Sequence, residues 1–510
     1  MTEHYDLGIV GWWYGDNYGS ILTYYALYSV LTNLGYSVAM IPRGSAPDVE
    51  PVLPNTPPVR FGNEMYNVVA RRPASSMFEL NDLFDGFICG SDQLWNPTIP
   101  IVNSENFLAF ASDDKRLLSY ATSFGASVLD NRWQKPVITR NIQNLRRFDA
   151  VSVREDYGIE IAQQIFGVSA TSVVDPVFIA EQSAFDTLAD LATSTVEGDY
   201  LFAFILDPAP EKRQSIEAVA QKLGLDSIVV MTGADSRTLQ ICREVFTGHH
   251  VVDDIDVGIF LNLLRRSTYV VTDSFHGTCF SWIYRRPFSS IVNEKRGADR
   301  FRYLFRLLDL KERELLLGLS AEDAIQNTNI SLDADFTRGE QQVMLEADRS
   351  REWLKTVLGS PIRPRGKEIL QTDCLLDVRS PAAFIKLESS WEMSIGTGSV
   401  ILDMHPKEKE LRDQYWRISL DKPLIGGHKY TVEISLSVLE GSPESLVFVW
   451  SNSCTGEEAL VQFDSLRSTQ SLSAPFDGID SLLIKVRQNT KRIRLSVAKV
   501  KITKVLPSKV

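Results

Sequence analysis

Cysteine is scarce in this sequence, and so are histidine and long apolar runs. The 510 residues include 5 cysteines, an odd number with no CxxC pair, and only 6 histidines. This composition argues against a disulfide framework and against a cysteine-based zinc site. No apolar run approaches the roughly 20 residues that cross a bilayer, and the N-terminus has no basic stretch leading into an apolar one, as a signal peptide has. We therefore expect a soluble, cytoplasmic protein without a transmembrane segment.

Positive charge is also in short supply. The 53 Lys and Arg residues face 65 Asp and Glu residues, which gives a formal net charge of −12. A general nucleic-acid binder needs a basic face that neutralises phosphates, so we expect no nucleic-acid partner. Neither a GxGxxG nor a Walker A sequence occurs, so dinucleotide binding and P-loop chemistry have little support. A local basic pocket for a small anion is still compatible with this composition.

What the sequence does contain is a long alternation of strand and helix patterns. A buried strand at 5–13, a helix at 20–34 and a strand at 36–41 predict a βαβ unit. Such units build parallel sheets. The stretch 42–75 is rich in proline and asparagine, and we expect a loop or mobile insertion there. The alternation recurs over 199–293, which predicts a second, smaller α/β domain.

The C-terminal part has a different pattern. After a Pro/Gly linker at 359–366 the apolar period changes from 3.6 to 2, which predicts an all-β sandwich or jelly roll. The predicted strands are 430–439, 445–451, 481–487 and 493–505. The predicted division of the chain is an N-terminal domain at 1–190, a second α/β domain at 191–335, a helix and linker at 336–366 and a β-sandwich at 367–510.

Polar and glycine-rich motifs follow several of the predicted strands. In open parallel sheets, ligands bind outside the carboxyl ends of the strands. Glycine allows backbone N–H groups to approach an anion closely, and helix N-termini favour negative charge. Two such domains that face each other would form a cleft with a histidine on one lip. The motifs are 15–19, 90–95, 123–125, 154–155 and 273–277.

A set of these motifs resembles the polysaccharide pyruvyl transferase family over roughly residues 5–315. In chain order they read GDNYGSILTYYAL, GSDQLWNP, SYATSFGAS, SVREDYG, VVDPVF and TDSFHG. The resemblance implies two Rossmann-like domains that face each other across a cleft, as in glycosyltransferase-B folds. It implies transfer of a pyruvyl group from phosphoenolpyruvate to a sugar of a bacterial surface glycan, usually as a cyclic ketal. Phosphoenolpyruvate would be a co-substrate, and we expect no further cofactor.

The resemblance also assigns roles to charged residues. His276 matches the family's acid/base histidine, and an imidazole is well suited to proton transfer near neutral pH; the alternative is a structural histidine. Arg154 is the candidate that holds the donor's carboxylate or phosphate, and its alternative is an ion pair with Glu155 or Asp156. We also place Asp92 in the catalytic group, as an acid or an acceptor for sugar hydroxyls, with helix capping as the alternative.

One departure from the family concerns the donor site. Some members carry an arginine two residues before the histidine, where this sequence has Ser274. Ser274 and the amides of Gly277 and Thr278 would then bind an oxyanion with less charge. Arg300, near the start of a predicted amphipathic helix, would add a second cation, unless it is simply exposed to solvent.

The acceptor side is predicted from the turns after the first and third strands. A turn role for Asn17 and a packing role for Trp95 are the alternatives to sugar contact. The candidate acceptor residues are Asn17, Tyr18, Gly90, Ser91 and Trp95. The metal-capable cluster HHVVDD at 249–254 has spacing that fits a strand and a helix cap better than a ligand set, so we predict no essential metal.

The C-terminal segment resembles jelly-roll carbohydrate-binding modules around 416–437. Its aromatic residues would stack on sugars if they lie at the surface, and are core residues otherwise. A glycan-binding module and an oligomerisation domain are therefore both open. The expected partners are phosphoenolpyruvate and a glycan or lipid-linked oligosaccharide, with peripheral membrane contact and a homo-oligomer as further options.

Three functions remain in competition. The first is the pyruvyl transferase. The second is an inverting glycosyltransferase that uses a nucleotide-sugar donor on the same fold. The third is a non-catalytic glycan-binding assembly protein.

Overall fold

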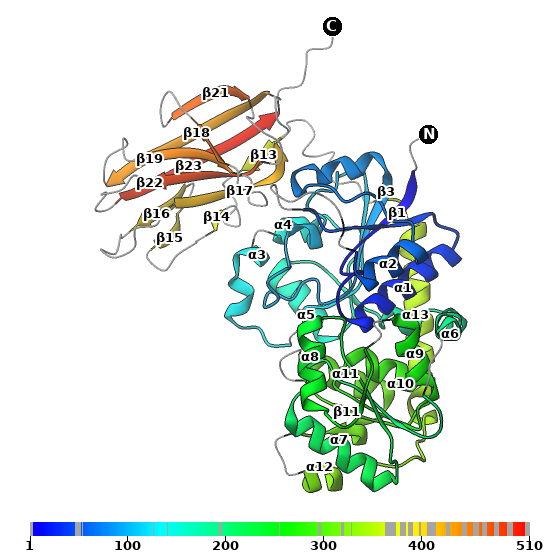
Figure 1. Ribbon diagram of the computed structural model, residues 1–510. Helices are drawn as coiled ribbons and strands as arrows, with labels where there is room; N and C mark the ends of the chain where they lie inside the picture. Colours follow the sequence, from blue (N-terminus) through cyan, green and yellow to red (C-terminus); the bar gives the residue numbers. More distant parts are fainter. Residues whose placement is uncertain are drawn as a thin grey trace.

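The fold was analysed in a computed structural model (Figure 1). It describes residues 4–45, 53, 55–125, 127–139, 141–192, 196–253, 256–293, 297–317, 321–327 and 329–362, and, beyond these, the backbone of the strands between 374 and 504.

The first α/β domain is built on a six-stranded sheet in which all strands run parallel. Its strand order is β2-β1-β3-β4-β5-β6, and the register pairs Gly8 with Ala39 on one side and with Phe87 on the other. The central strands are buried because helices cover both faces, as expected for a parallel sheet. The strands are β1 (Tyr5–Val10), β2 (Val38–Ile41), β3 (Phe84–Asp92), β4 (Arg116–Thr122), β5 (Ser152–Val153) and β6 (Thr171–Ser172).

The helices of this domain are mostly short, apart from the first. α1 is buried along most of its first three turns and begins at the side-chain cap formed by Asn17, which accepts a hydrogen bond from the Gly19 amide. The helices are α1 (Tyr18–Asn33), α2 (Pro57–Met65), η1 (Ala74–Asp82), η2 (Ser104–Phe107), η3 (Asn131–Gln134), α3 (Pro136–Thr139), α4 (Ile142–Arg146), α5 (Tyr157–Ile161), η4 (Ala162–Phe166) and η5 (Pro176–Phe178).

The stretch 42–75, which we expected to be a loop, contains the helix α2 and ordered backbone pairings. Proline occupies the first turn of α2, where its missing N–H costs nothing. Gly62 lies against the indole of Trp13, since a Cβ there would be only 2.3 Å from the ring. The loop prediction, which rested on the proline and asparagine content, was wrong for 57–65, because the prolines stand at a helix start.

The second α/β domain repeats this architecture. Its six parallel strands have the order β12-β11-β10-β7-β8-β9. The prediction of two α/β domains with parallel sheets is confirmed, and the exact domain boundaries stay predictions. The elements are α6 (Gln182–Leu191), β7 (Leu201–Phe204), α7 (Pro210–Leu223), β8 (Ile228–Met231), α8 (Ser236–Val245), β9 (His250–Val251), α9 (Val257–Arg266), β10 (Tyr269–Thr272), α10 (Phe275–Ile283), β11 (Phe288–Ile291), α11 (Ala298–Leu308), η7 (Lys311–Arg313), β12 (Glu314–Leu315) and α12 (Ala321–Asn327).

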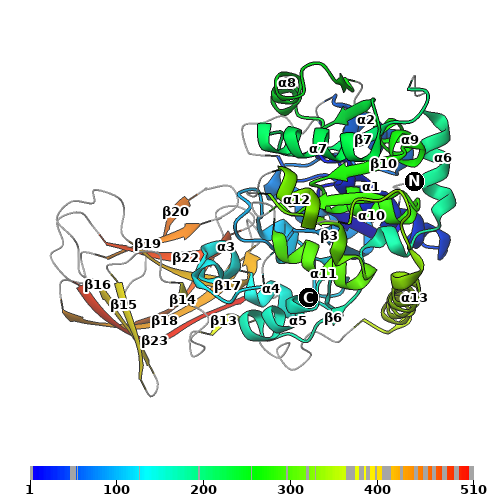
Figure 2. The ribbon, with the colours of Figure 1, turned by 90° about the horizontal axis from the view of Figure 1, so that it is seen from below.

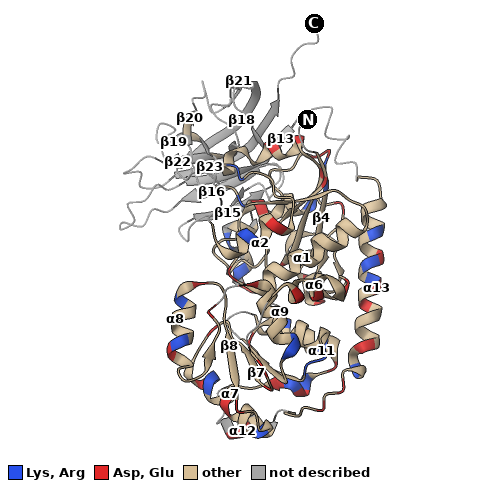
Figure 3. Cartoon of the chain, turned by 45° about the vertical axis from the view of Figure 1, so that its right-hand side comes forward, with Lys and Arg blue, Asp and Glu red and all other residues tan. Residues whose placement is uncertain are grey.

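The long helix α13 (Thr337–Gly359) runs along both α/β domains (Figures 1 and 3). At its start, Gly339 packs against the carbonyl of Leu308 in the second domain. Further along, Ser350 Oγ accepts a hydrogen bond of 3.0 Å from the Val174 amide, and the carbonyl of Val357 accepts one of 2.6 Å from Arg116 Nη1. The helix predicted at about 337–358 therefore ties the end of the second domain back to the first.

The C-terminal strands form two antiparallel sheets beside the α/β part (Figure 2). The four strands predicted here match β18, β19, β22 and β23, while the interpretation as a carbohydrate-binding sandwich stays a prediction. The strands are β13 (Cys374–Asp377), β14 (Phe384–Ile385), β15 (Trp391–Gly396), β16 (Ser399–Met404), β17 (Tyr415–Leu424), β18 (Lys429–Glu440), β19 (Leu446–Ser451), β20 (Glu458–Val461), β21 (Arg467–Ser473), β22 (Ile479–Val486) and β23 (Ile493–Lys504).

The docking of α13 gives a stability prediction. A methyl group at Gly339 would lie 2.1 Å from the Leu308 carbonyl oxygen, so Gly339→Ala must displace the helix. We expect a loss of about 1–3 kcal/mol in the free energy of unfolding, as for other overpacked sites. Gly359→Ala is the matched control on the same helix, because no atom lies within 4 Å of its added methyl. Urea unfolding of both variants checks this, and equal midpoints would contradict the proposed docking.

Candidate active site

The carboxyl ends of the two sheets face each other through the first turns of α1 and α10. Gly19 of α1 lies directly against His276 of α10, where a Cβ on the glycine would be 2.4 Å from Cβ of the histidine. Tyr18 of α1 is stacked on Phe260 of the second domain, with ring centroids 5.8 Å apart. Only glycine allows so close an approach of two helices, so position 19 sets how tightly the domains close over the site.

His276 is buried and is held by a carboxylate from the other domain. Its Nε2 lies 3.2 Å from Oδ2 of Asp175, and only 2% of the residue is exposed. The other oxygen of Asp175 accepts hydrogen bonds from Thr23 Oγ1 at 2.7 Å and from the Val177 amide at 3.2 Å. A carboxylate that holds one ring nitrogen fixes the orientation of an imidazole. The pair therefore has the geometry of an oriented acid/base group.

Arg154 lies beside this pair and is surrounded by carboxylates. Its Nη1 donates to Asp175 Oδ2 at 2.9 Å, and its Nε donates to Glu155 Oε1 at 3.0 Å. Its third nitrogen, Nη2, lies 3.6 Å from Asp92 Oδ1 and makes no hydrogen bond with any residue that the structure describes. Nη2 is therefore the nitrogen of Arg154 that is able to donate hydrogen bonds to a ligand.

Arg300 completes the group from α11. It is 5% exposed, and its Nη1 lies 3.6 Å from the same Oδ1 of Asp92 that faces Arg154. Both guanidinium groups also lie over the ring of Phe275, at 4.5 and 5.5 Å from its centroid. The alternative expectation, that Arg300 is simply exposed to solvent, is therefore wrong. We refer to this set as the buried ion cluster: Asp92, Arg154, Glu155, Asp175, His276 and Arg300.

The charges of the cluster shift one another's ionisation. Burial alone would raise the pKa of Asp175, but His276 and Arg154 outweigh it and hold that pKa well below its usual value. The pKa of Asp92 is lowered in the same way, because Arg154 and Arg300 outweigh its burial. Burial and the charge of Arg154 lower the pKa of Arg300. Both aspartates are therefore ionised at neutral pH.

The backbone at this edge of the first sheet is strained. Ser91 and Asp92 at the end of β3 have φ values of 39° and 66°, and Ala121 on neighbouring β4 has φ of 50°. Side chains at such positive φ values cost about 1–3 kcal/mol each and gather at functional sites. The turn aims Asp92 at the two arginines and turns the Ser91 carbonyl toward the hydroxyl of Tyr24, which donates to it at 2.8 Å.

The family of the chain follows from its sequence. The model of the family described as "Polysaccharide pyruvyl transferase" matches residues 17–295, which contain every member of the buried ion cluster except Arg300. The chain belongs to this family. No curated protein matches the chain.

Solved structures similar to this family member share little sequence with it. The UDP-GlcNAc 2-epimerase of Methanocaldococcus jannaschii is 13% identical, with 69% of this chain and 99% of that chain covered and a TM-score of 0.42. A UDP complex of S. aureus MnaA is 10% identical, with 72% and 99% covered and a TM-score of 0.45. The wall teichoic acid polymerase TagF is 12% identical, with 72% and 90% covered and a TM-score of 0.39.

The residues predicted to bind the donor at the start of α10 hold the first turn of that helix. Ser274 is the N-cap of α10 and accepts a hydrogen bond of 3.2 Å from the Gly277 amide through Oγ, while its carbonyl accepts the Thr278 amide at 3.0 Å. These two amides are therefore already bonded within the helix. Asp273, the residue before this N-cap, does not cap the helix and accepts the Leu206 amide at 2.6 Å.

Asp273 forms a buried link between two strand ends of the second sheet. Besides the Leu206 amide at the end of β7, its carboxylate accepts Lys212 Nζ at 2.6 Å and the Asp207 amide at 3.1 Å. The link fixes the turn between β10 and α10, three residues before His276. Asp273 is thus a positioning residue for the imidazole.

The five predicted acceptor residues lie in different surroundings. Asn17 caps α1, and Tyr18 is buried against Phe260 between the domains. Gly90 backs onto the side chain of Leu27 on α1. Ser91 Oγ belongs to the site, because it lies 3.5 Å from Oδ2 of Asp175 and accepts Thr23 Oγ1 at 3.1 Å.

Trp95 packs in the core of the first domain. It is fully buried, stacks on Phe107 and donates its indole N–H to the Asn106 carbonyl at 2.9 Å. This placement favours the packing alternative for Trp95 over sugar contact.

For the HHVVDD cluster, the described part of the chain contains no group of three or more His, Cys, Asp or Glu residues that could hold a metal ion.

Sequence reasoning missed Asp175, the partner of His276. The signal was present, because VVDPVF was one of the family motifs and places an aspartate just after a strand of the first domain. Thr23, which donates to Asp175, was also missed. The sequence also contained a signal that Arg300 is buried. Arg300 shares helical spacing with buried Leu304 and Leu307, so it lies on the apolar face of α11.

The lowered pKa values predict an acid-sensitive fold. A carboxylate whose pKa is depressed in the folded state stabilises the fold above its unfolded pKa of about 4, and this contribution is lost as the pH falls through the folded value. We expect the urea midpoint to fall steeply below about pH 4. In Asp92→Asn this fall should be smaller, whereas in the exposed control Asp114→Asn it should match wild type. An equal fall in all three proteins would contradict the assigned ion pairs.

Proposed function

We propose that this transferase moves a pyruvyl group from phosphoenolpyruvate to a sugar of a bacterial surface polysaccharide, or of its precursor, and forms a ketal. The observation that carries the proposal is the pair of His276 and Asp175 beside two buried guanidinium groups. An oriented imidazole supplies proton transfer, and two cations suit a donor with a carboxylate and a phosphate. Family membership supports a polysaccharide-modifying transferase at the coarser level.

The chemistry divides between proton transfer and charge stabilisation. Protonated His276 gives a proton to the methylene carbon of phosphoenolpyruvate, which creates an oxocarbenium-like carbon. A sugar hydroxyl adds its oxygen to that carbon and returns a proton to the imidazole. Phosphate leaves with the electrons of its C–O bond. A second hydroxyl then closes the ketal and gives its proton to the departing phosphate. Asp175 holds Nε2 and so fixes the orientation of the imidazole that exchanges the proton.

Donor binding requires an exchange of ion-pair partners. Within the cluster, three carboxylates face two guanidinium groups and an imidazole, so the arginines carry little free positive charge. The contacts of Asp92 with Arg154 and Arg300 are the longest, at 3.6 Å each. We infer that the donor replaces Asp92 at these two cations. Arg300 then supplies the positive charge that some family members gain from an arginine at the position of Ser274.

Access to the cluster requires the two domains to separate, because its members are all buried. On one rim, Ser127 donates to Asp299 through its amide at 3.1 Å, and Arg306 Nη2 pairs with Asp156 at 2.7 Å. On another, the Ala234 amide donates to the carbonyl of Asp16 at 2.7 Å. These exposed or edge contacts are weak individually. We infer that the main cost of opening lies in the buried Asp175–His276 contact and the Tyr18–Phe260 packing, and that closure excludes water during the reaction.

The C-terminal strands extend the proposal to the acceptor. We propose that residues 367–510 form a sandwich that binds glycan and presents it to the cleft, which fits a polysaccharide acceptor. No helix in the described part of the chain is long and apolar enough to span a membrane. A cytoplasmic setting, a lipid-linked acceptor and a homo-oligomer belong to the same proposal.

Calorimetric titration with phosphoenolpyruvate tests the donor. Arg300→Gln should weaken binding at least tenfold, equivalent to about 1.4 kcal/mol, because it removes one of two cations from a buried site. Arg302→Gln, an exposed position two residues along the same helix, is the matched control and should stay within twofold of wild type.

The same titration separates the competing functions. Binding of a nucleotide sugar without phosphoenolpyruvate binding would replace the proposal by a glycosyltransferase. Binding of neither donor, with glycan binding retained, would point to a non-catalytic assembly protein. Circular dichroism of both variants verifies that the arginine substitutions leave the fold intact.

A further inference from the structure

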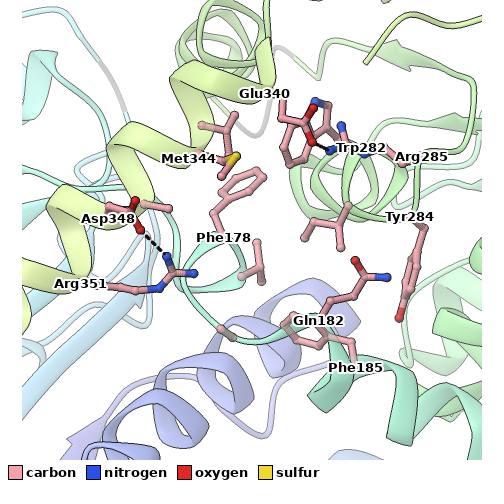
Figure 4. A pocket seen from close by; sticks show the side chains of 15 residues that line it. Phe178, Gln182, Phe185, Trp282, Tyr284, Arg285, Glu340, Met344, Asp348 and Arg351 are labelled. Carbon is pink, nitrogen blue, oxygen red and sulfur yellow. Dashed lines mark hydrogen bonds and ion pairs between the residues drawn. The ribbon is translucent and has the colours of Figure 1, made fainter. Parts of the chain in front are cut away.

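A cavity of about 390 Å³ lies where the chain crosses between the two α/β domains. Its walls come from four segments: the turn that follows Asp175, α6, the end of α10 and the middle of α13 (Figure 4). No member of the buried ion cluster lines it. The cavity is therefore separate from the candidate active site, yet it is built from the segments that join the domains.

The floor of the cavity is aromatic. Phe178 points into it between Met344 and Trp282 (Figure 4), and the rings of Phe178 and Trp282 meet edge to face at 5.9 Å. Trp282 is 6% exposed, and its indole N–H has no hydrogen-bond partner among the residues that the structure describes. The indole nitrogen is itself inaccessible, so Trp282 contributes apolar ring surface to the floor of the cavity.

The rim is polar but carries no net charge. Arg351 pairs with Asp348 at 2.9 Å, and Arg285 pairs with Glu340 (Figure 4). Gln182 adds a neutral amide from α6. Planar carboxylate, amide and guanidinium groups hold neighbouring hydroxyls through paired hydrogen bonds, and their cancelling charges give no preference for an anion.

The geometry disfavours a flat aromatic ligand. The guanidinium of Arg285 covers one face of the Trp282 ring at 4.4 Å, and Phe178 meets that ring with its edge. The indole therefore offers no open face for stacking. Aromatic surface combined with scattered planar polar groups suits a ligand with apolar C–H faces and many hydroxyls.

We propose that this cavity is a second saccharide site, which binds one or two neutral sugar units. The class of ligand rests on the lining alone. That the sugar belongs to the acceptor glycan, and that its binding is coupled to catalysis, rests on the proposed function.

The coupling has a short physical route. Val177 lines the cavity, and its amide donates to Asp175, the partner of His276. Trp282 stands at the last turn of α10, whose first turn carries His276. A sugar in the cavity therefore touches both segments that hold the catalytic pair, and we expect occupancy to change donor affinity at least threefold, with the reciprocal effect on sugar affinity.

Saturation-transfer NMR with glucose, galactose, N-acetylglucosamine and lactose tests the site on the full chain, with uridine as the aromatic comparison. At least one sugar should bind. Trp282→Phe should weaken that binding at least fivefold, and Ala347→Met, which fills the cavity from α13, should abolish it. Trp133→Phe is the matched control, because its indole N–H donates to Val128 outside the cavity. Binding by no sugar, sugar binding that survives both cavity variants, or uridine binding in the cavity instead would overturn the proposal.

Phosphoenolpyruvate titrations on the same proteins keep the two proposals distinguishable. Loss of sugar binding with intact donor binding in Ala347→Met is the expected result. If wild type binds sugar but not phosphoenolpyruvate, the saccharide site stands and the donor assignment fails. If saturating sugar leaves the donor affinity unchanged, the coupling is contradicted although the site remains.

Discussion

The buried ion cluster at the junction of the two sheets is the interaction on which the remainder of the structure depends. Asp175 brings together a hydroxyl of α1, a guanidinium from the end of β5 and the imidazole of the opposite domain. Buried charges are tolerated only when each has partners, and removal of one partner typically costs about 3–5 kcal/mol. The cluster therefore ties the two domains together and contains the groups on which the proposed pyruvyl transfer rests.

Several features of the fold serve to keep this cluster in place. Gly19 lets α1 approach His276, and Tyr18 anchors the same turn in the aromatic core of the second domain. Asp273 and Lys212 fix the turn that carries the histidine. Helix α13 returns from the second domain to the first, and its Ser350 holds the amide of Val174, the residue before Asp175. The same helix lines the cavity proposed as a saccharide site, so a ligand there would contact segments that hold the catalytic pair.

Much of this arrangement could be predicted from the sequence. Strand and helix periodicity gives two parallel α/β domains, and the rule that ligands lie at strand carboxyl ends brings Asp92, Arg154 and His276 to one place. The role of Asp175 could not be predicted from local pattern, because its partner His276 lies 101 residues away in another domain. The helix at 57–65 was missed because proline at a helix start looks the same, in sequence, as proline in a loop.

The most direct test of the account is a double-mutant cycle on the free energy of unfolding with Asp175→Asn, His276→Gln and the double variant. Because Nε2 of His276 and Oδ2 of Asp175 are 3.2 Å apart and buried, the account predicts that the two substitutions are strongly non-additive, with a coupling of about 1–3 kcal/mol. Additive effects within about 0.5 kcal/mol would mean that the carboxylate does not hold the imidazole, and that the two domains do not share one active site.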